Sequence, residues 1–171
     1  MDRIAKFEKV SFEEFKSAWL KQIGTPTDEP KLQEIYDNIK IPKRATTGSA
    51  GYDFYTPISL SLDAGSEIMV PTGIRAKFEP EYALIIAPKS GLGSKFRLQL
   101  NNTFGLIDSD YYNSNNQGHI MCKLINDSRE NKSINLDAGA SFVQGFFVKI
   151  GITIDDDADG IRNGGFGSTS K

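Results

Sequence analysis

From residue 41 onward, the chain consists of short stretches of alternating apolar residues separated by turns, and this pattern restricts the fold most. Residues 52–78, YDFYTPISLSLDAGSEIMVPTGIRAKF, alternate in this way, with turn signals at DAG and PTG. The stretches YALIIAP, RLQLNN, HIMCKLIN and SFVQGFFVKIGITI repeat the pattern. Many short strands at fairly even spacing predict an antiparallel sandwich or barrel and not a doubly wound parallel sheet.

Residues 1–40 have a different, helical periodicity. Ser11 followed by Glu14 forms a capping box, and aromatic and aliphatic residues then recur at helical spacing. Gly24 and TPTDEP end this helix, and a second one is predicted in PKLQEIYDNIK, beginning near Pro30. We expect a helical hairpin that packs on the main body or on a neighbouring subunit. It carries no catalytic pattern, so its expected role is structural.

Composition narrows the classes of partner. With 171 residues, 39% of them hydrophobic, the chain can fill one core, and a net charge of −2 gives no basic field for nucleic acid. There is no apolar run long enough for a signal peptide core or a membrane span. Cys122 is the only cysteine, which excludes an intrachain disulfide. We therefore expect a cytoplasmic protein that binds neither nucleic acid nor membrane.

Several kinds of catalytic centre are poorly supported. His119 is the only histidine and there is no Cys/His set for zinc, while GGFGSTSK lacks the Gly-Lys-Ser/Thr order of a phosphate loop. Polar clusters on turns remain in SAGYDF, APKSGLGSK, NNTFGLIDSDYYN and AGASFVQGF. Backbone amides in the second cluster suit phosphate oxygens. Each cluster alone has an ordinary explanation in turn chemistry.

The order of these clusters is specific. Five segments resemble, in order, the five motifs of the trimeric all-β dUTPases. They are AGYDFY (50–55), PKSGLGSK (88–95), GLIDSDYYN (105–113), GASFVQ (139–144) and RNGGFGSTS (162–170). The resemblance implies a mainly β, antiparallel jelly-roll-like barrel at 41–160. A short N-terminal helical extension at 1–40 precedes it, and a mobile C-terminal arm at 161–171 closes over the active site.

The family cleaves dUTP to dUMP and pyrophosphate by attack of water at the α-phosphorus, with Mg²⁺ on the triphosphate. By resemblance, Asp108 activates the water, as a carboxylate can, and Asp53 holds metal-bound water without ligating the metal directly. Ser90, Gln144 and Arg162 complete the implied catalytic set. Ser90 acts with Lys89 and the Gly91 amide on the leaving pyrophosphate, Gln144 contacts the α-phosphate, and Arg162 contacts the γ-phosphate.

The resemblance also assigns recognition of the base and sugar. Tyr111 is expected under the deoxyribose, where it would clash with a 2′-hydroxyl, and Phe166 is expected to stack on the uracil. Ser168 and Thr169 would bond the terminal phosphate. The full implied substrate-binding set is Lys89, Ser90, Gly91, Asn102, Gly105, Leu106, Ile107, Asp108, Tyr111, Met121, Gln144, Arg162, Phe166, Gly167, Ser168 and Thr169. A homotrimer with sites shared between chains is implied as well.

The chain departs from the family pattern in places. Lys89 stands where Arg is usual, extra polar residues precede Gly118, and only Asn163 separates Arg162 from the glycines. Two alternatives remain. One is a dCTP deaminase-type relative, although no Glu lies inside the third motif. The other is a dUTP-binding regulatory protein that recruits a partner through residues 1–40.

Overall fold

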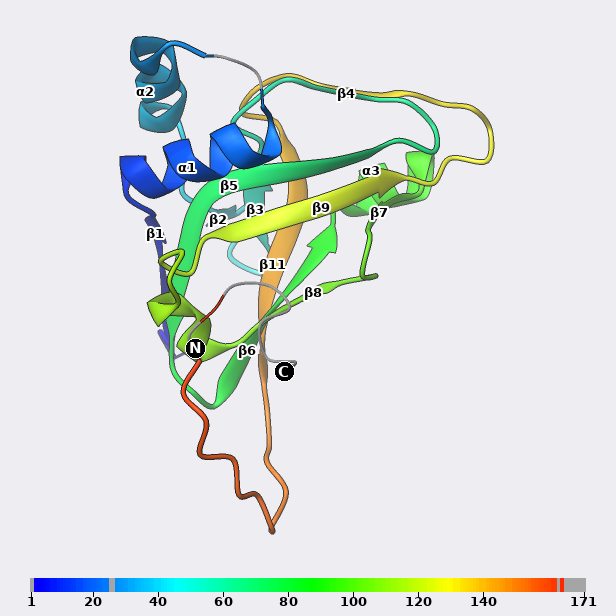
Figure 1. Cartoon of the computed structure of the whole chain (residues 1–171). Helices are drawn as coiled ribbons and strands as arrows, with labels where there is room; N and C mark the ends of the chain where they lie inside the picture. Colours follow the sequence, from blue (N-terminus) through cyan, green and yellow to red (C-terminus); the bar gives the residue numbers. More distant parts are fainter. Residues whose placement is uncertain (1, 25–26, 163, 165–171) are drawn as a thin grey trace.

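The computed structural model describes residues 2–24, 27–162 and 164 (Figure 1). Its strands are β1 (Ala5–Lys9), β2 (Lys43–Arg44), β3 (Tyr52–Tyr55), β4 (Leu60–Leu62), β5 (Glu67–Phe78), β6 (Tyr82–Pro88), β7 (Leu98–Leu100), β8 (Gly105–Ile107), β9 (Ile120–Asn126), β10 (Ile134–Leu136) and β11 (Ser141–Lys149). Its helices are α1 (Phe12–Gln22), α2 (Glu29–Asp37), α3 (Ser90–Phe96) and the 3₁₀ segment η1 (Ser109–Asn113).

Two larger sheets and a two-stranded ribbon form the body of the protein. One sheet has the strand order β1-β5-β9-β7, the other has the order β2-β3-β11-β6-β8, and β10 pairs with β4. Neighbours within each sheet run antiparallel. Strands adjacent in space are mostly distant in sequence. The antiparallel β fold predicted from the alternating pattern is confirmed, and so is the jelly-roll-like type that the resemblance implied.

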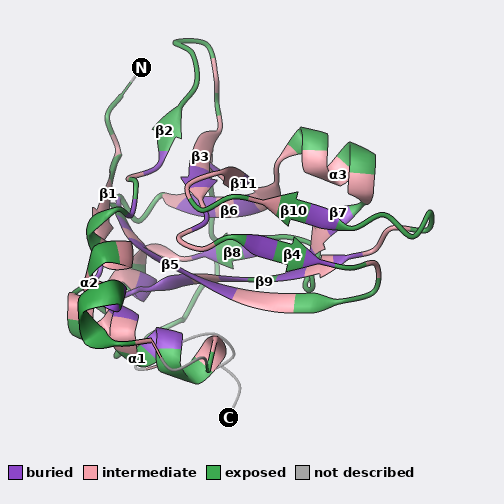
Figure 2. Cartoon of the chain, turned by 90° about the horizontal axis from the view of Figure 1, so that it is seen from above, coloured by how far each residue is buried: buried purple, intermediate pink, exposed green. Residues whose placement is uncertain are grey.

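The core fills the space between these sheets because each strand buries every second side chain. Leu84 and Ile86 of β6 are buried with Leu124 of β9, Phe54 of β3 and Phe142 of β11. In Figure 2 the buried colour follows long parts of β5 and β9, whereas the outward faces of the helices are exposed. This shared interior fixes the positions of the strands that carry the candidate site.

The N-terminal segment packs directly on the body. As its sequence predicts, α1 begins after Ser11, whose side chain accepts from the Glu14 N–H, and α2 has Pro in its first turn. Phe15 and Trp19 of α1 enter the main core. The structure adds strand β1, which pairs with β5 at the sheet edge and was not expected from the sequence. In Figure 1, α1 lies across β5.

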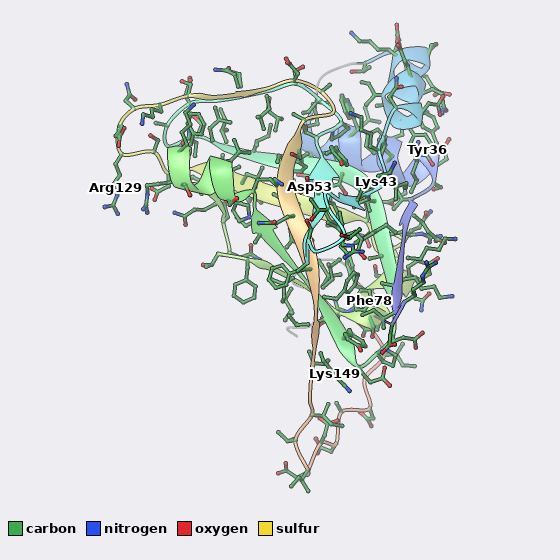
Figure 3. All side chains as sticks on the ribbon, turned by 180° about the vertical axis from the view of Figure 1, so that it is seen from behind. Tyr36, Lys43, Asp53, Phe78, Arg129 and Lys149 are labelled. Atoms are coloured by element: carbon green, nitrogen blue, oxygen red, sulfur yellow. The ribbon has the colours of Figure 1, made fainter. Side chains whose placement is uncertain are left out.

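The last described part of the chain projects from the body. After β11, residues 150–162 run outward and return toward the N-terminal end (Figure 1). Ile150, Ile152 and Ile154 are exposed along this segment, and so is Ile161. Figure 3 shows Lys149 near the point where this segment leaves the body. Among the described residues, there is no helix with the length and apolar character that spanning a membrane requires.

Candidate active site

An apolar pocket of about 210 Å³ opens beside β8. Four of the residues expected to bind the base line it, namely Asn102, Gly105, Ile107 and Met121. They meet because β8 pairs with β6 while β9 contributes its first residues from the opposite sheet. Leu106 lies between Gly105 and Ile107 on β8, so its side chain takes the opposite face, where it is about half exposed.

Asp108 and Tyr111 lie immediately after this pocket. Asp108 follows Ile107 and precedes η1, and its backbone carbonyl accepts from the Tyr111 N–H at 3.2 Å. Tyr111 is buried, and this burial raises the pKa of its hydroxyl above the usual value. The Asp108 side chain is half exposed. The third-motif acid is therefore accessible at the pocket rim, while the tyrosine is fixed behind it.

Arg162 lies against the same acid. Its guanidinium pairs with Asp108 and also approaches Asp110, with Nε 3.0 Å from Oδ1. The guanidinium carbon is 5.6 Å from the centre of the Tyr111 ring. Within one chain, the expected γ-phosphate cation thus contacts the expected base.

The remaining predicted polar residues form a second group at the other end of β6. Lys89 Nζ is 2.6 Å from Asp53 Oδ1, and Gln144 pairs with Asp53 across β3 and β11. Gln144 Nε2 donates to the Pro88 carbonyl at 3.2 Å. Ser90 begins α3, so the first amides of that helix have no acceptor in a preceding turn. Figure 3 shows Asp53 on β3 beside β11.

The loop expected at PKSGLGSK is a short helix in the structure. Its first backbone bond runs from the Gly93 N–H to the Lys89 carbonyl, and Arg97 ends it in the left-handed conformation with φ of 55°. Helix formation orients the Ser90 and Gly91 amides together at one end. The expected phosphate-gripping amides are therefore carried by a helix terminus and not by an open loop.

The two groups are well separated within one chain. Leu84 near the start of β6 pairs with Ile107, which precedes Asp108, whereas Pro88 at its end precedes Lys89. The six residue-to-residue steps from Ala83 to Lys89 span about 20 Å at the rise of a β-strand. In Figure 1 the β6 arrow accordingly points toward α3. Asp108 and Ser90 of one chain therefore cannot contact the same phosphate group.

Some site residues could not be found by reading motifs. Ile86, Leu100 and Cys122 line the pocket, and Asp110 approaches Arg162. The alternation of β6 and β9 places these apolar residues inward, but it does not distinguish a pocket wall from ordinary core. Burial raises the pKa of the Cys122 thiol to about 12, so this wall is chemically inert. The predicted Phe166, Gly167, Ser168 and Thr169 lie outside the described residues.

The described residues contain no group of three or more histidine, cysteine or acidic side chains that could hold a metal ion. Asp53 presents a single carboxylate, with one oxygen bonded to Lys89. Mg²⁺ takes one or two protein carboxylates when phosphates and waters supply its other ligands. The Asp53 carboxylate, with one oxygen still available, therefore fits a residue that holds a water of a metal whose direct ligands come from a polyphosphate and other waters.

The pocket, the acid at its rim and the amides at the start of α3 occur in a chain whose residues 37–170 match the family model dUTPase. A deoxyuridine 5'-triphosphate nucleotidohydrolase of Herminiimonas arsenicoxydans is 35% identical over 158 residues, covering 89% of this chain and 99% of the relative. The chain belongs to the dUTPase family. The family model leaves out most of the segment that contains β1, α1 and α2.

Solved dUTPases have the same fold. The crystal structure of the dUTPase from Streptococcus mutans matches with a TM-score of 0.63 and 32% identity, covering 88% of this chain and 98% of that one. A dUTPase from phage phi11 of S. aureus, described with a structural Mg(II) ion, also gives 0.63 at 15% identity, covering 92% and 98%. The second similarity concerns the fold alone.

Proposed function

We propose that this dUTPase-family enzyme hydrolyses dUTP to dUMP and pyrophosphate, in a cytoplasmic setting. The observation that carries the proposal is the position of Asp108 at the end of β8, directly after residues that line the apolar pocket. A uracil ring in this pocket would place the α-phosphate beyond the rim, where a water bound to Asp108 can attack it. The pocket would thus determine both which base is bound and where the α-phosphorus lies.

Base recognition would come from the β7–β8 hairpin. The Asn102 side chain and the Gly105 backbone would offer polar groups at a pocket whose other walls are mainly apolar, including Ile107 and Met121. Hydrogen bonds to a uracil edge in such a site discriminate against a cytosine edge, because the wrong base leaves buried polar groups unpaired. Tyr111, fixed next to Asp108, would form the floor under the deoxyribose.

Phosphate binding would come from the second group of residues. The Ser90 hydroxyl and the Gly91 amide at the start of α3 would bond oxygens of the leaving pyrophosphate, with Lys89 supplying positive charge. Gln144 would donate to the α-phosphate without adding a charge. Bound Mg²⁺ would withdraw charge from the phosphate oxygens. Asp53 would hold one of its waters.

A site that uses both groups requires two chains, since they lie about 20 Å apart along β6. We therefore propose a homotrimer in which Asp108 of one chain faces Ser90 of the next. A neighbouring chain contributes the C-terminal arm to the same site. The projecting segment after β11, with Ile150, Ile152 and Ile154 exposed, supports an assembly that covers it. In that assembly Arg162 would exchange Asp108 for a phosphate.

Substitution of the proposed base tests the reaction. Asp108→Asn keeps the shape of the side chain and removes the proton acceptor, so the kcat for pyrophosphate release from dUTP should fall by a factor of about 10³. Binding of a non-hydrolysable dUTP analogue, measured by calorimetry, should change by less than about fivefold, a loss of one hydrogen bond. Retained turnover would exclude Asp108 as the base.

A panel of nucleotides tests the substrate. The wild-type protein with Mg²⁺ should release pyrophosphate from dUTP in preference to dCTP, dTTP and UTP, and EDTA should stop the reaction. Ammonia release from dCTP would contradict the proposal and favour a deaminase. Analogue binding without turnover of any nucleotide would favour a regulatory binding protein.

A further inference from the structure

The loop that follows η1, residues 114–119, is bound by the start of α1. Gln117 makes two hydrogen bonds to Ser11: its Oε1 accepts from the Ser11 N–H at 2.9 Å, and its Nε2 donates to the Ser11 hydroxyl at 2.8 Å. In a capping box, a glutamate three residues on accepts from the N-cap N–H. Here Gln117, 106 residues away in sequence, takes that place and leaves Glu14 available for another partner.

Glu14 contacts the buried His119 instead. Glu14 Oε1 lies 3.2 Å from His119 Nδ1, and His119 Nε2 accepts from the Gly73 N–H at 2.9 Å. Since Nε2 is an acceptor, the proton of the neutral ring is on Nδ1 and faces the Glu14 carboxylate. Both ring nitrogens are therefore engaged, one by α1 and one by β5. The ring cannot turn without breaking one of these bonds.

The backbone of the same histidine holds Tyr111. The Tyr111 hydroxyl donates to the His119 carbonyl at 2.8 Å and accepts from Asn116 Nδ2 at 2.8 Å. Tyr111 is 3% exposed, so these polar contacts are shielded from water and have a firm geometry. Two hydrogen bonds, one to the ring and one to the backbone carbonyl of His119, thus link Glu14 to Tyr111.

A third contact joins the N-terminal segment to η1 itself. The Tyr112 hydroxyl donates to Glu8 Oε2 at 2.7 Å, and Arg75 covers the Tyr112 ring with its guanidinium carbon 4.3 Å from the ring centre. Glu8 is on β1, so β1 and α1 grip opposite ends of the 109–119 segment. This segment carries Tyr111, and three residues that bond it from outside, Glu8, Ser11 and Glu14, lie outside the family model.

We propose that the N-terminal segment is a positioning element of the active site, in which Glu14, through His119, sets the position of the Tyr111 ring and thereby the preference for deoxyribose over ribose. The inference rests on the proposed function, because it takes Tyr111 as the floor of the sugar site. A ring held from behind cannot retreat from a 2′-hydroxyl. When the restraint is cut, the ring can yield, and a ribonucleotide gains access.

The first experiment compares dUTP with UTP. In Glu14→Ala, the ratio of kcat/KM for dUTP to that for UTP should fall about fivefold, the effect of one hydrogen bond. Glu14→Gln keeps an acceptor oxygen facing Nδ1 and should retain the wild-type ratio within about twofold, by the same reasoning. Glu13→Ala, exposed on the same helix turn, is the matched control and should leave the ratio unchanged. An unchanged ratio in Glu14→Ala would overturn the inference.

A double-mutant cycle tests whether Glu14 acts through His119 and the Tyr111 hydroxyl. Tyr111→Phe removes the hydroxyl that bonds to the His119 carbonyl, so Glu14→Ala in that background should produce no further change in the ratio. An equal fivefold fall in both backgrounds would show that Glu14 acts by another path and would contradict the inference. If Glu14→Ala does not fold, Glu14→Asp replaces it, because it keeps the charge and withdraws the carboxylate from His119 Nδ1 by one methylene.

Hydrogen exchange supplies a readout that does not depend on turnover. Peptides covering 109–119 should exchange faster in Glu14→Ala than in the wild type, while peptides from β11 should not change. Unchanged exchange at 109–119 would overturn the inference even if activity fell. Conversely, a wild-type protein that releases no pyrophosphate from dUTP would refute the proposed function, whereas faster exchange at 109–119 would still establish the restraint.

Discussion

Glu8 is a single carboxylate held by several partners at the sheet edge. Lys6 Nζ is 2.9 Å from Oε1, while Oε2 accepts from the Tyr112 hydroxyl at 2.7 Å and lies 3.2 Å from Arg75. The bond from Lys6, followed by that from Tyr112, lowers the pKa of Glu8 to about 2. The folded protein therefore holds this carboxylate ionised at a pH where the unfolded chain would protonate it.

The lowered pKa of Glu8 determines how its contribution to the free energy of unfolding changes with pH. Because the folded-state pKa is below the unfolded value of about 4.5, the contribution of Glu8 is present above pH 4.5 and is lost as the pH falls toward 2. Glu8→Gln should lower the free energy of unfolding at pH 7 by up to about 1 kcal/mol, and the difference from wild type should shrink toward pH 2. Urea titrations at a series of pH values measure it.

The exposed Glu13→Gln is the control for Glu8→Gln and should follow the wild type over the same range. A difference between Glu8→Gln and wild type that stays constant from pH 7 to pH 2 would show that the substitution acts through packing and not through the carboxylate charge.

Single residues differ in how far the sequence identifies them. Motif order was enough to propose Asp108, Asn102 and Met121, and the structure places all three at or beside one pocket. The contact of Arg162 with Asp108, by contrast, depends on the path of residues 150–161, which carry no periodic signal. Gln117 and His119 could not be linked to Ser11 and Glu14 because these contacts span more than a hundred residues.

Among the elements, the η1 segment depends on one glycine. Gly118 has φ of +72°, and a Cβ there would lie 2.7 Å from Tyr112 Cα and 2.9 Å from the Tyr111 carbonyl oxygen. Both atoms belong to the backbone, so they cannot move aside as a flexible side chain would. The turn that returns the chain from η1 to β9 therefore requires a residue without a side chain.

Gly118→Ala should destabilise the protein by about 3 kcal/mol, through unfavourable φ together with this clash. Gly65→Ala is a matched control, since Gly65 has φ of +80° with no atom near the added Cβ. Gly65→Ala should lower the free energy of unfolding by only about 1 kcal/mol, from the unfavourable φ alone. Thermal unfolding of both variants measures the difference, and equal losses would refute the close approach at Gly118.

Local sequence signals explain which elements could be predicted. Ser11 and Pro30 mark the starts of α1 and α2, and alternation marks β5, β6 and β9. β1 was missed because AKFEK has too few apolar residues to alternate clearly, and it is a strand only because β5 offers a free edge. α3 was expected as a loop because its two glycines are weak helix formers, and tertiary context overrides that preference.

At the scale of the whole molecule, the separation of Asp108 and Ser90 by about 20 Å along β6 leads to a complementation test. Asp108→Asn and Ser90→Ala should each be inactive alone. After the two are unfolded and refolded together at equal amounts, random trimers should regain about a quarter of wild-type activity, because one interface in four pairs an intact Asp108 with an intact Ser90. Pyrophosphate release before and after mixing measures this.

A mixture that stays inactive, although mass measurement confirms mixed trimers, would contradict shared sites. Co-refolded Asp108→Asn with itself is the control and should remain inactive, since no chain then provides the acid. Trimers with full activity would be equally inconsistent, because they would require each site to tolerate the loss of one residue.

The bonds between Ser11 and Gln117 also have a consequence for synthesis. The ribosome makes α1 106 residues before it makes Gln117, a delay of about 5 to 20 s at ordinary elongation rates. For most of that interval Phe15 and Trp19 lack a complete sheet to pack on, because β5, which α1 crosses, ends at Phe78 and its partner β9 begins only at Ile120. A nascent chain that stalls in the middle of the barrel therefore displays an apolar helix near its free end, where chaperones and proteases can recognise it before a defective enzyme accumulates.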